Sequence, residues 1–231
     1  MSAMISDFRL LLNSKRHILI VSLPDNDLEL ARAAIEAGAD VVKLHVNVTH
    51  KATGRAFPSW PAARRNIERI CDLGICVGIV PGDENRFAAE EHLLEMQEMG
   101  ISFIDFFIND APTYVLNTRL AKMVALNDFS QALYVQVVQS LGANALELSI
   151  VPKEHYGERL TLWDLTRYSY AAKNSPIPCF VPSEKKIQPD EVTSVLACGI
   201  KGLIIGSIVT GNSLKEFVRA VQAFRRHMDS F

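Results

Sequence analysis

The polar residues of one apolar strand are the strongest chemical signal in this sequence. Between residues 40 and 47, Lys43, His45 and Asn47 alternate with valine and leucine. Because successive side chains of a strand point to opposite faces, all three share one face. Burying them under apolar helices would cost about 1–3 kcal/mol each. We therefore expect this face to point into a polar interior, with Lys43 and His45 as candidate catalytic residues.

Two other apolar runs carry acids that could meet this lysine. Asp105 lies in the run 102–109, and Glu147 lies in the run 144–151. A buried lysine needs an acidic partner or a lowered pKa, and carboxylates beside it would form a site for proton transfer. The alternative is a structural ion pair. The acids and His45 could also bind a divalent metal, but no ligand spacing indicates one.

Eight apolar runs are expected to be the strands that position these residues. They are continuous rather than alternating, as strands buried on both faces should be. Amphipathic helical patterns separate them, for example over 27–38 and 213–227. The runs are 17–23, 40–47, 76–81, 102–109, 121–127, 144–151, 177–182 and 202–207. We predict one α/β domain over residues 1–231, a single (β/α)8 TIM barrel, with an open doubly wound sheet as the alternative.

A repeated joint supports this prediction. A helical pattern ends in glycine and a strand follows at once, and glycine at this position takes the left-handed conformation that ends a helix. The joints are at Gly38, Gly74, Gly100, Gly142 and Gly199. A short helix over 7–13 is expected to close the floor of the barrel.

The last part of the chain predicts a phosphate site. A strand over 177–182, a helix opened by Pro189 and a strand ending in Gly206-Ser207 follow one another. Backbone N–H groups after strands 7 and 8 of a barrel commonly hold phosphate. Gly206 allows close approach of the backbone, and Ser207 offers a hydroxyl and an N–H.

The exit of the seventh strand adds three charged candidates. Glu184 can reach the barrel mouth and is a candidate catalytic residue. Lys185 and Lys186 are candidate phosphate ligands, with a solvated loop as the alternative.

The insertion over 48–61 is a candidate lid or substrate clamp. It could instead only cover the mouth or pack on another subunit.

Composition excludes several partners. The net charge of −2 provides no basic field for nucleic acid or an anionic membrane surface. No apolar run approaches the roughly 20 residues of a membrane span, and the N-terminus lacks the features of a signal peptide. We therefore expect a cytoplasmic protein. The four cysteines form no CxxC pair, and we expect them to be buried as small hydrophobes.

The stretch from Lys185 to Thr210 resembles the ribulose-phosphate-binding barrel superfamily, most closely the N-acetylmannosamine-6-phosphate 2-epimerases. The matching residues are the Ile187-Gln-Pro-Asp-Glu segment before a helix and Gly206-Ser207 after a strand. The resemblance implies a phosphorylated ligand at these residues. That family carries its catalytic lysine on strand 3, where residues 78–82 hold none, and its Asp-Ala-Thr segment is absent here. The resemblance therefore extends to the phosphate site and not to epimerase catalysis.

These observations favour a cofactor-independent isomerase, epimerase or lyase that acts on a small phosphorylated metabolite. One alternative is a Schiff-base aldolase or synthase with Lys43 or Lys122 as nucleophile. Another is an oxidoreductase that binds FMN through its phosphate. The third is a barrel that binds a phosphorylated metabolite without catalysis. We expect no cofactor or metal, and small barrels often pair as homo-oligomers.

Overall fold

Eight parallel strands form a closed barrel in sequence order, from β1 next to β2 round to β8 next to β1. The computed structural model describes residues 6–50, 54–128 and 134–231. The strands are β1 (Ile18–Ser22), β2 (Val41–His45), β3 (Cys76–Val80), β4 (Phe103–Phe107), β5 (Ala121–Ala125), β6 (Ala145–Glu147), β7 (Cys179–Pro182) and β8 (Gly202–Ile205). Each lies within a predicted run, so the predicted TIM barrel is confirmed.

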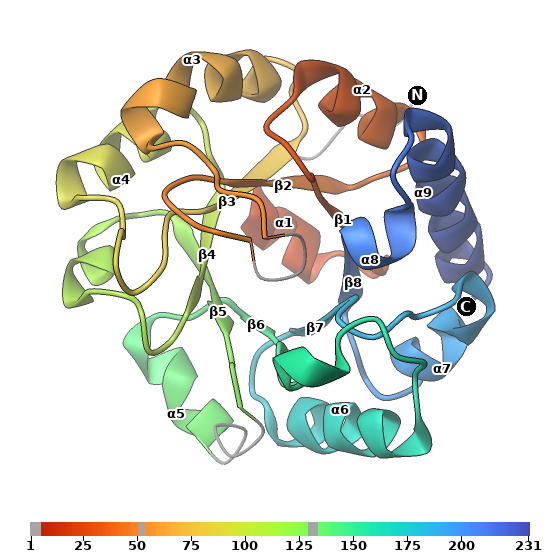
Figure 1. Cartoon of the computed structure of the whole chain (residues 1–231). Coiled ribbons are helices and arrows are strands. Elements are labelled where there is room, and N and C mark those ends of the chain that lie inside the picture. Colours follow the sequence, from red (N-terminus) through yellow and green to blue (C-terminus); the bar gives the residue numbers. More distant parts are fainter. Residues whose placement is uncertain (1–5, 51–53, 129–133) are drawn as a thin grey trace.

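Helices form a ring outside the strands (Figure 1). The ring consists of α2 (Leu28–Glu36), α3 (Trp60–Cys71), α4 (Glu90–Glu98), α5 (Val135–Val138), α6 (Leu162–Asn174), α7 (Val192–Leu196) and α9 (Leu214–Asp229). Between β4 and β5 the connection is a short 3-10 helix, Thr113–Asn117. Another short helix, α8 (Ser207–Thr210), begins directly after β8, although the sequence predicted no helix before residue 213.

Local sequence signals define the helix ends. Asp27 and Ser213 cap α2 and α9, where their side chains accept hydrogen bonds from backbone N–H groups of the first turn. The glycines of the predicted joints all have positive φ, between 75° and 105°. Such values favour glycine, so these joints end each helix and turn the chain into the next strand.

Helix α1 (Phe8–Asn13) closes the floor of the barrel, as predicted, and lies at its centre in Figure 1. The Phe8 ring stacks on Phe103, with 4.0 Å between ring centroids. Gly78 makes room for this pair, because a Cβ at that position would lie 2.1 Å from the Phe103 ring. The lower interior is thereby filled with apolar side chains, and polar side chains can remain only near the opposite end.

A second apolar layer lies between the strands and the outer helices. Trp60 and Tyr168 are fully buried there, beside aliphatic side chains of alternate strand positions. Each strand is therefore covered on both faces, which explains the continuous apolar runs. Within the described ranges, no helix combines the length and the apolar character needed to cross a membrane.

Candidate active site

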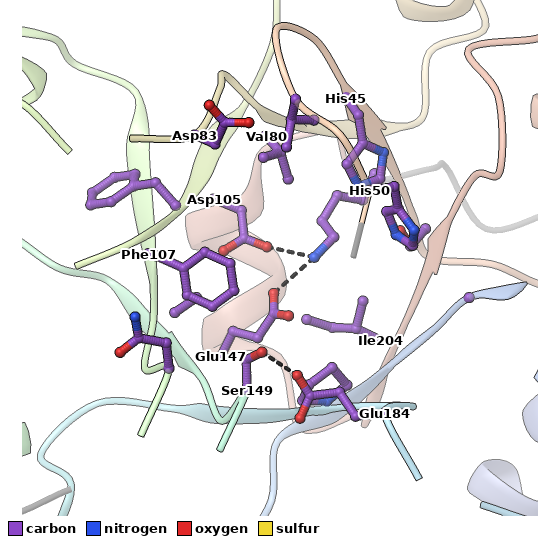
Figure 2. Close-up of a pocket in the computed structure, with 18 of the residues that line it drawn as sticks. His45, His50, Val80, Asp83, Asp105, Phe107, Glu147, Ser149, Glu184 and Ile204 are labelled. Carbon is purple, nitrogen blue, oxygen red and sulfur yellow. Dashed lines mark hydrogen bonds and ion pairs between the residues drawn. The ribbon is translucent and has the colours of Figure 1, made fainter. Parts of the chain in front are cut away.

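The carboxyl ends of the strands enclose a cavity of about 390 Å³ (Figure 2). Alternation along the strands determines which side chains reach it. The inward positions of β2, β4 and β6 place Lys43, Asp105 and Glu147 in its wall. Among the sequence candidates, the cavity is lined by Lys43, His45, Asp105, Glu147, Glu184, Gly206 and Ser207.

Lys43 bridges two acids at the bottom of this cavity. Its Nζ donates to Asp105 Oδ2 at 2.6 Å and to Glu147 Oε2 at 2.8 Å (Figure 2). All three residues are buried, with 5%, 2% and 8% of their surfaces exposed. Lys43 is in register with Gly78 of β3, so no side chain on that neighbouring strand position competes for its space.

The ionisation of these groups is coupled. Burial opposes the charge of Lys43, but the carboxylates of Asp105 and Glu147 raise its pKa above the usual value. Burial raises the pKa of Asp105, and the Glu147 carboxylate adds to this increase. Burial would also raise the pKa of Glu147, but Lys43 holds it below the usual range. The arrangement is a lysine ammonium beside an ionised Glu147 and an Asp105 that holds a proton more readily.

A second carboxylate, Glu184, follows β7 and also faces the cavity. Its Oε1 accepts hydrogen bonds from the hydroxyls of Ser149 and Tyr156, the latter at 2.6 Å. Its Oε2 accepts the Val151 N–H at 3.1 Å. Burial raises the pKa of Glu184 to about 7, although these three donors oppose the increase. Glu184 is therefore suited to gain and lose a proton near neutral pH.

Hydrogen bonds between the loop after β6 and the loop after β7 hold Glu184 in place. The segment 148–161 follows β6 and carries Tyr156, which the sequence analysis missed. The Gly157 N–H donates to the Glu184 carbonyl at 2.8 Å, and the Lys186 N–H donates to the Glu158 carbonyl at 2.7 Å. No periodic pattern marks Tyr156, since it follows a 3-10 turn. Its role depends on contact with a residue 28 positions away.

His45 and His50 form an uncharged pair at the β2 side. Their rings meet edge to face with 5.1 Å between centroids, and Phe57 packs against His45 at 4.7 Å. Burial, the neighbouring His50 and Lys43 lower the pKa of His45 well below its usual value. Burial and Lys43 lower the pKa of His50 to about 4. Both imidazoles are therefore neutral near pH 7.

The insertion over 48–61 brings His50 to this position. In its described part, Thr49 bridges Ala56, and the His50 N–H donates to the Arg55 carbonyl at 2.8 Å. Val48, Thr49 and His50 line the cavity. The insertion therefore covers part of the mouth. A role as lid or clamp remains a prediction.

The exit of β8 lies next to the exit of β7. The Gly206 N–H donates to Ser183 Oγ at 3.0 Å. Ser207 and Ile208, the first residues of α8, line the cavity. The first N–H groups of a helix have no partner within it, so the N–H groups of Ser207 and Ile208 are the donors available to an anion at this end.

Four polar residues do not lie where the sequence analysis placed them. Asn47 does not line the cavity; it follows the end of β2, donates to the Pro81 carbonyl and accepts the Trp60 N–H. Lys122 is on the outward parity of β5, and its Nζ donates to the carbonyls of Thr118 and Leu120, both at 3.0 Å. It therefore cannot be the nucleophile of this cavity.

The two lysines after Glu184 are also misplaced. Lys185 lies in the turn after β7, and its Nζ pairs with Glu158 at 3.0 Å. Lys186 is exposed, and neither lysine lines the cavity. The prediction that Lys185 and Lys186 bind the phosphate is therefore corrected. The backbone N–H groups at Ser207 remain candidate phosphate ligands.

The side of the cavity formed by the exits of β3 and β4 is acidic. Asp83 and Glu84 follow β3, Asp110 follows β4, and all three line the cavity. The sequence analysis singled out none of these three acids. In the ranges that the structure describes, no three His, Cys, Asp or Glu side chains are grouped to hold a metal ion.

No family model matches this chain, and no curated protein matches it. Solved structures resemble it in fold. Thiamine phosphate pyrophosphorylase from Pyrococcus furiosus is 15% identical with a TM-score of 0.66, over 97% of this chain and 98% of that one. Phosphoribosyl anthranilate isomerase from Thermus thermophilus is 15% identical with a TM-score of 0.66, over 92% and 99%.

A third similar structure was solved with a phosphorylated compound. (S)-3-O-geranylgeranylglyceryl phosphate synthase from Thermoplasma acidophilum, in complex with sn-glycerol-1-phosphate, is 13% identical with a TM-score of 0.64, over 96% of each chain. At such identities the likeness establishes the fold alone. The barrel that the resemblance implied is thereby confirmed.

Proposed function

We propose that this chain is an enzyme that transfers a proton at a carbon next to a carbonyl group in a small phosphorylated metabolite. The observation that carries the proposal is Lys43, buried between Asp105 and Glu147 at the bottom of an open cavity. A barrel that only bound a metabolite would have no need for three ionisable groups there, since buried ion pairs seldom stabilise a fold.

The proposed step divides the work between two sides of the cavity. Glu184, with a pKa of about 7, takes the proton as the C–H bond breaks. The electron pair of that bond moves to the carbonyl oxygen, which becomes an enolate. The Lys43 ammonium stabilises this negative oxygen. Where the deprotonated carbon carries a hydroxyl, that hydroxyl passes its proton to the former carbonyl oxygen, Glu184 returns its proton to the former carbonyl carbon, and an isomer results. Delivery of a different proton, from solvent, to the opposite face of the original carbon gives an epimer and leaves Glu184 to release its own proton to solvent.

The charge of Lys43 favours this role over Schiff-base chemistry. A nucleophilic amine must be unprotonated, and enzymes achieve this by lowering the pKa of the lysine. Here the carboxylates of Asp105 and Glu147 raise the pKa of Lys43, despite its burial. The ammonium is therefore the stable form, and it is suited to stabilise an anion rather than to attack a carbonyl.

The phosphate part of the proposal is supported by the β8 exit. Ser207 and Ile208 start α8 at the edge of the cavity, where backbone N–H groups can bind phosphate. Ser183 Oγ accepts the Gly206 N–H, so its own proton is free to be donated to an anion. Several of the similar structures are of proteins that are named after a phosphorylated compound.

Solvent exchange tests the proposal directly. Candidate phosphoesters would first be selected by their stabilisation of the protein in a thermal shift assay. Each binder would then be incubated with enzyme in D₂O, and incorporation of deuterium next to its carbonyl would be followed by proton NMR. We expect incorporation with the parent protein, and a reduction of at least about 100-fold with either Lys43→Met or Glu184→Gln.

Borohydride treatment of the same mixtures separates the alternatives. Irreversible attachment of substrate to Lys43 would replace the proposal with the Schiff-base mechanism. Glu98→Gln, an exposed substitution on α4, is the matched control and should retain full exchange. Binding without exchange for every bound carbonyl compound would contradict the proposed chemistry.

A further inference from the structure

We propose that the substrate carries a protonated amine as well as its phosphate, and that the amine binds Asp105 on the side of the cavity where Asp83 and Asp110 supply further negative charge. The inference rests on the proposed function and names the substrate class for the same cavity. The two groups would lie on opposite sides, with phosphate at the β7 and β8 exits and amine at the β3 and β4 exits.

The order of the strands places these sides apart. In a closed ring of eight strands, β4 lies opposite β8, and β3 lies opposite β7. Asp83 follows β3 and Asp110 follows β4, while Ser207 follows β8. A substrate with opposite charges at its two ends would therefore have only one favourable orientation across the cavity.

An unsatisfied oxygen inside the cavity marks the position of a ligand. Asp105 Oδ2 binds Lys43, but Asp105 Oδ1 is buried and has no hydrogen-bond partner among the described residues. Asp105 is only 2% exposed and lines the cavity. Leaving a buried acceptor unpaired costs about 1–3 kcal/mol, more for a charged group. A donor on the substrate would satisfy this oxygen, and the positive charge of an ammonium would also favour the ionised form of Asp105, which burial and Glu147 oppose.

The charges of the lining favour a cation. Among the described residues that line the cavity, Lys43 is the sole lysine or arginine, and two of the six acids already bind it. Of the other four, Asp83 pairs with Arg86, which does not line the cavity, at 3.9 Å, and Glu184 has a pKa of about 7. Both lining histidines have lowered pKa values and are neutral near pH 7. The lining acids are Asp83, Glu84, Asp105, Asp110, Glu147 and Glu184. A cavity lined mainly by one sign of charge concentrates ligands of the opposite sign.

Matched pairs of small phosphoesters test the inference. Phosphoethanolamine and ethyl phosphate form one pair, and glucosamine 6-phosphate and glucose 6-phosphate form the other. Isothermal titration calorimetry would be run near pH 6.5 with EDTA at low ionic strength, where the amines are protonated. In at least one pair, we expect the phosphoester with the amine to bind at least about tenfold more tightly than the phosphoester without it. The preference should weaken as salt is added.

Substitution on the acidic side should remove this preference. Asp83→Asn combined with Asp110→Asn should bring the two affinities of a pair within about twofold, since each Asn keeps the shape of the side chain and loses its charge. Glu98→Gln is exposed on α4, outside the cavity, and should leave the preference intact. Far-UV circular dichroism of each variant would establish that the comparison is made between folded proteins. If the double substitution does not fold, Glu84→Gln provides a smaller reduction of the same charge.

The outcomes separate this inference from the proposed function. Equal affinities within both pairs would overturn the amine site and leave the phosphate proposal intact. Tight binding of glucosamine alone, with no contribution from phosphate, would keep the amine site and contradict the phosphate proposal. A further outcome is that glucose 6-phosphate binds as tightly as glucosamine 6-phosphate when Mg²⁺ replaces EDTA. In that case the acids would bind a metal ion, and the inference would be wrong. Absence of binding by both amines would overturn it as well.

Discussion

At the scale of single residues, the properties of Lys43 come from its two partners. The nearest positions on its own strand are apolar, so within the described part of the chain its charge is balanced by Asp105 and Glu147, from β4 and β6. Removing the ammonium would leave two carboxylates facing each other in a buried position. Breaking a buried ion pair in this way costs far more than the intact pair contributes.

Lys43→Met should therefore inactivate the enzyme and make its stability strongly dependent on pH. Without the ammonium, burial and mutual repulsion would raise the pKa values of both acids in the folded state. A pKa raised on folding contributes stability below the unfolded pKa and loses it as pH rises through the folded pKa. We expect a deficit of about 3–5 kcal/mol near pH 8 that shrinks toward pH 5. Urea denaturation at both pH values measures it.

A second substitution provides the control. Glu147→Gln in the Lys43→Met background removes one of the two facing charges, so stability near pH 8 should recover while activity stays absent. A deficit that is the same at pH 5 and pH 8 would mean that the lysine contributes packing rather than charge.

Glu184 should make the parent protein less stable as pH rises toward neutrality. Its pKa of about 7 in the folded state lies above the usual 4.5. The folded state therefore holds a proton that the unfolded state has lost between these values, and stability falls as pH rises across that window. Glu184→Gln lacks this titration. Between pH 4.5 and pH 8, its free energy of unfolding should fall by roughly 3 kcal/mol less than that of the parent.

Tyr156→Phe tests the Glu184 carboxyl by removing one of its hydrogen-bond donors and keeping the carboxyl itself. The tyrosine hydroxyl donates to Glu184 Oε1 and stabilises its ionised form, so its removal should raise the pKa of Glu184 further. The acidic limb of the pH–activity profile should move to higher pH. An unchanged limb in both variants would assign that ionisation to another group.

At the scale of elements, the short helix α1 fills the floor of the barrel. It is six residues long, too short to be stable by itself. Its fully buried Phe8 stacks on Phe103 and fills the floor, and Gly78 of β3 leaves space for the rings. The floor keeps water out of the lower barrel, so the polar groups of the site are confined to the opposite end.

Phe8→Ala should reduce the free energy of unfolding by about 3–5 kcal/mol, because it removes a buried ring and leaves a cavity beneath the site. Leu10→Ala in the same helix is the control, since Leu10 is 61% exposed and its removal should change stability by less than about 0.5 kcal/mol. Thermal or urea denaturation compares the two. Equal effects would mean that α1 does not act as a plug.

At the scale of the whole molecule, closure depends on the seam between β1 and β8. Here Ile18 pairs with Gly202 and Ile20 pairs with Ile204. A Cβ at Gly202 would lie 2.1 Å from the Ile18 carbonyl oxygen and 2.8 Å from the Phe180 ring. The backbone of the first strand could not move away without breaking the ladder that closes the barrel.

Gly202→Ala should therefore cost at least about 3 kcal/mol, the upper end of the usual penalty for overpacking. Gly206→Ala, four residues later, is the matched control for stability. Its Cβ would meet only Ser22 at 3.7 Å, and its φ of −142° suits any residue. Denaturation curves should shift strongly for the first variant and little for the second. Equal shifts would show that closure tolerates a side chain at the seam.

Local periodicity determined much of the fold and part of the site. The apolar runs, the glycine joints and the alternation along each strand depend only on neighbouring residues. They predicted eight strands and the inward direction of Lys43, His45, Asp105 and Glu147. The outward direction of Lys122 was missed although Asn127, at the end of the predicted run 121–127, has the opposite parity and lines the cavity.

Contacts between distant segments were decided only by the tertiary structure. Lys43 meets Glu147 across 104 positions, and Tyr156 reaches Glu184 from a loop without any pattern. Which acid meets the lysine depends on the register of strands around the closed barrel. Which charges stay near the mouth depends on loop conformation, as when Lys185 turns to Glu158 instead of the cavity. Sequence periodicity specifies the face of an element, but only the packing of all elements specifies what that face meets.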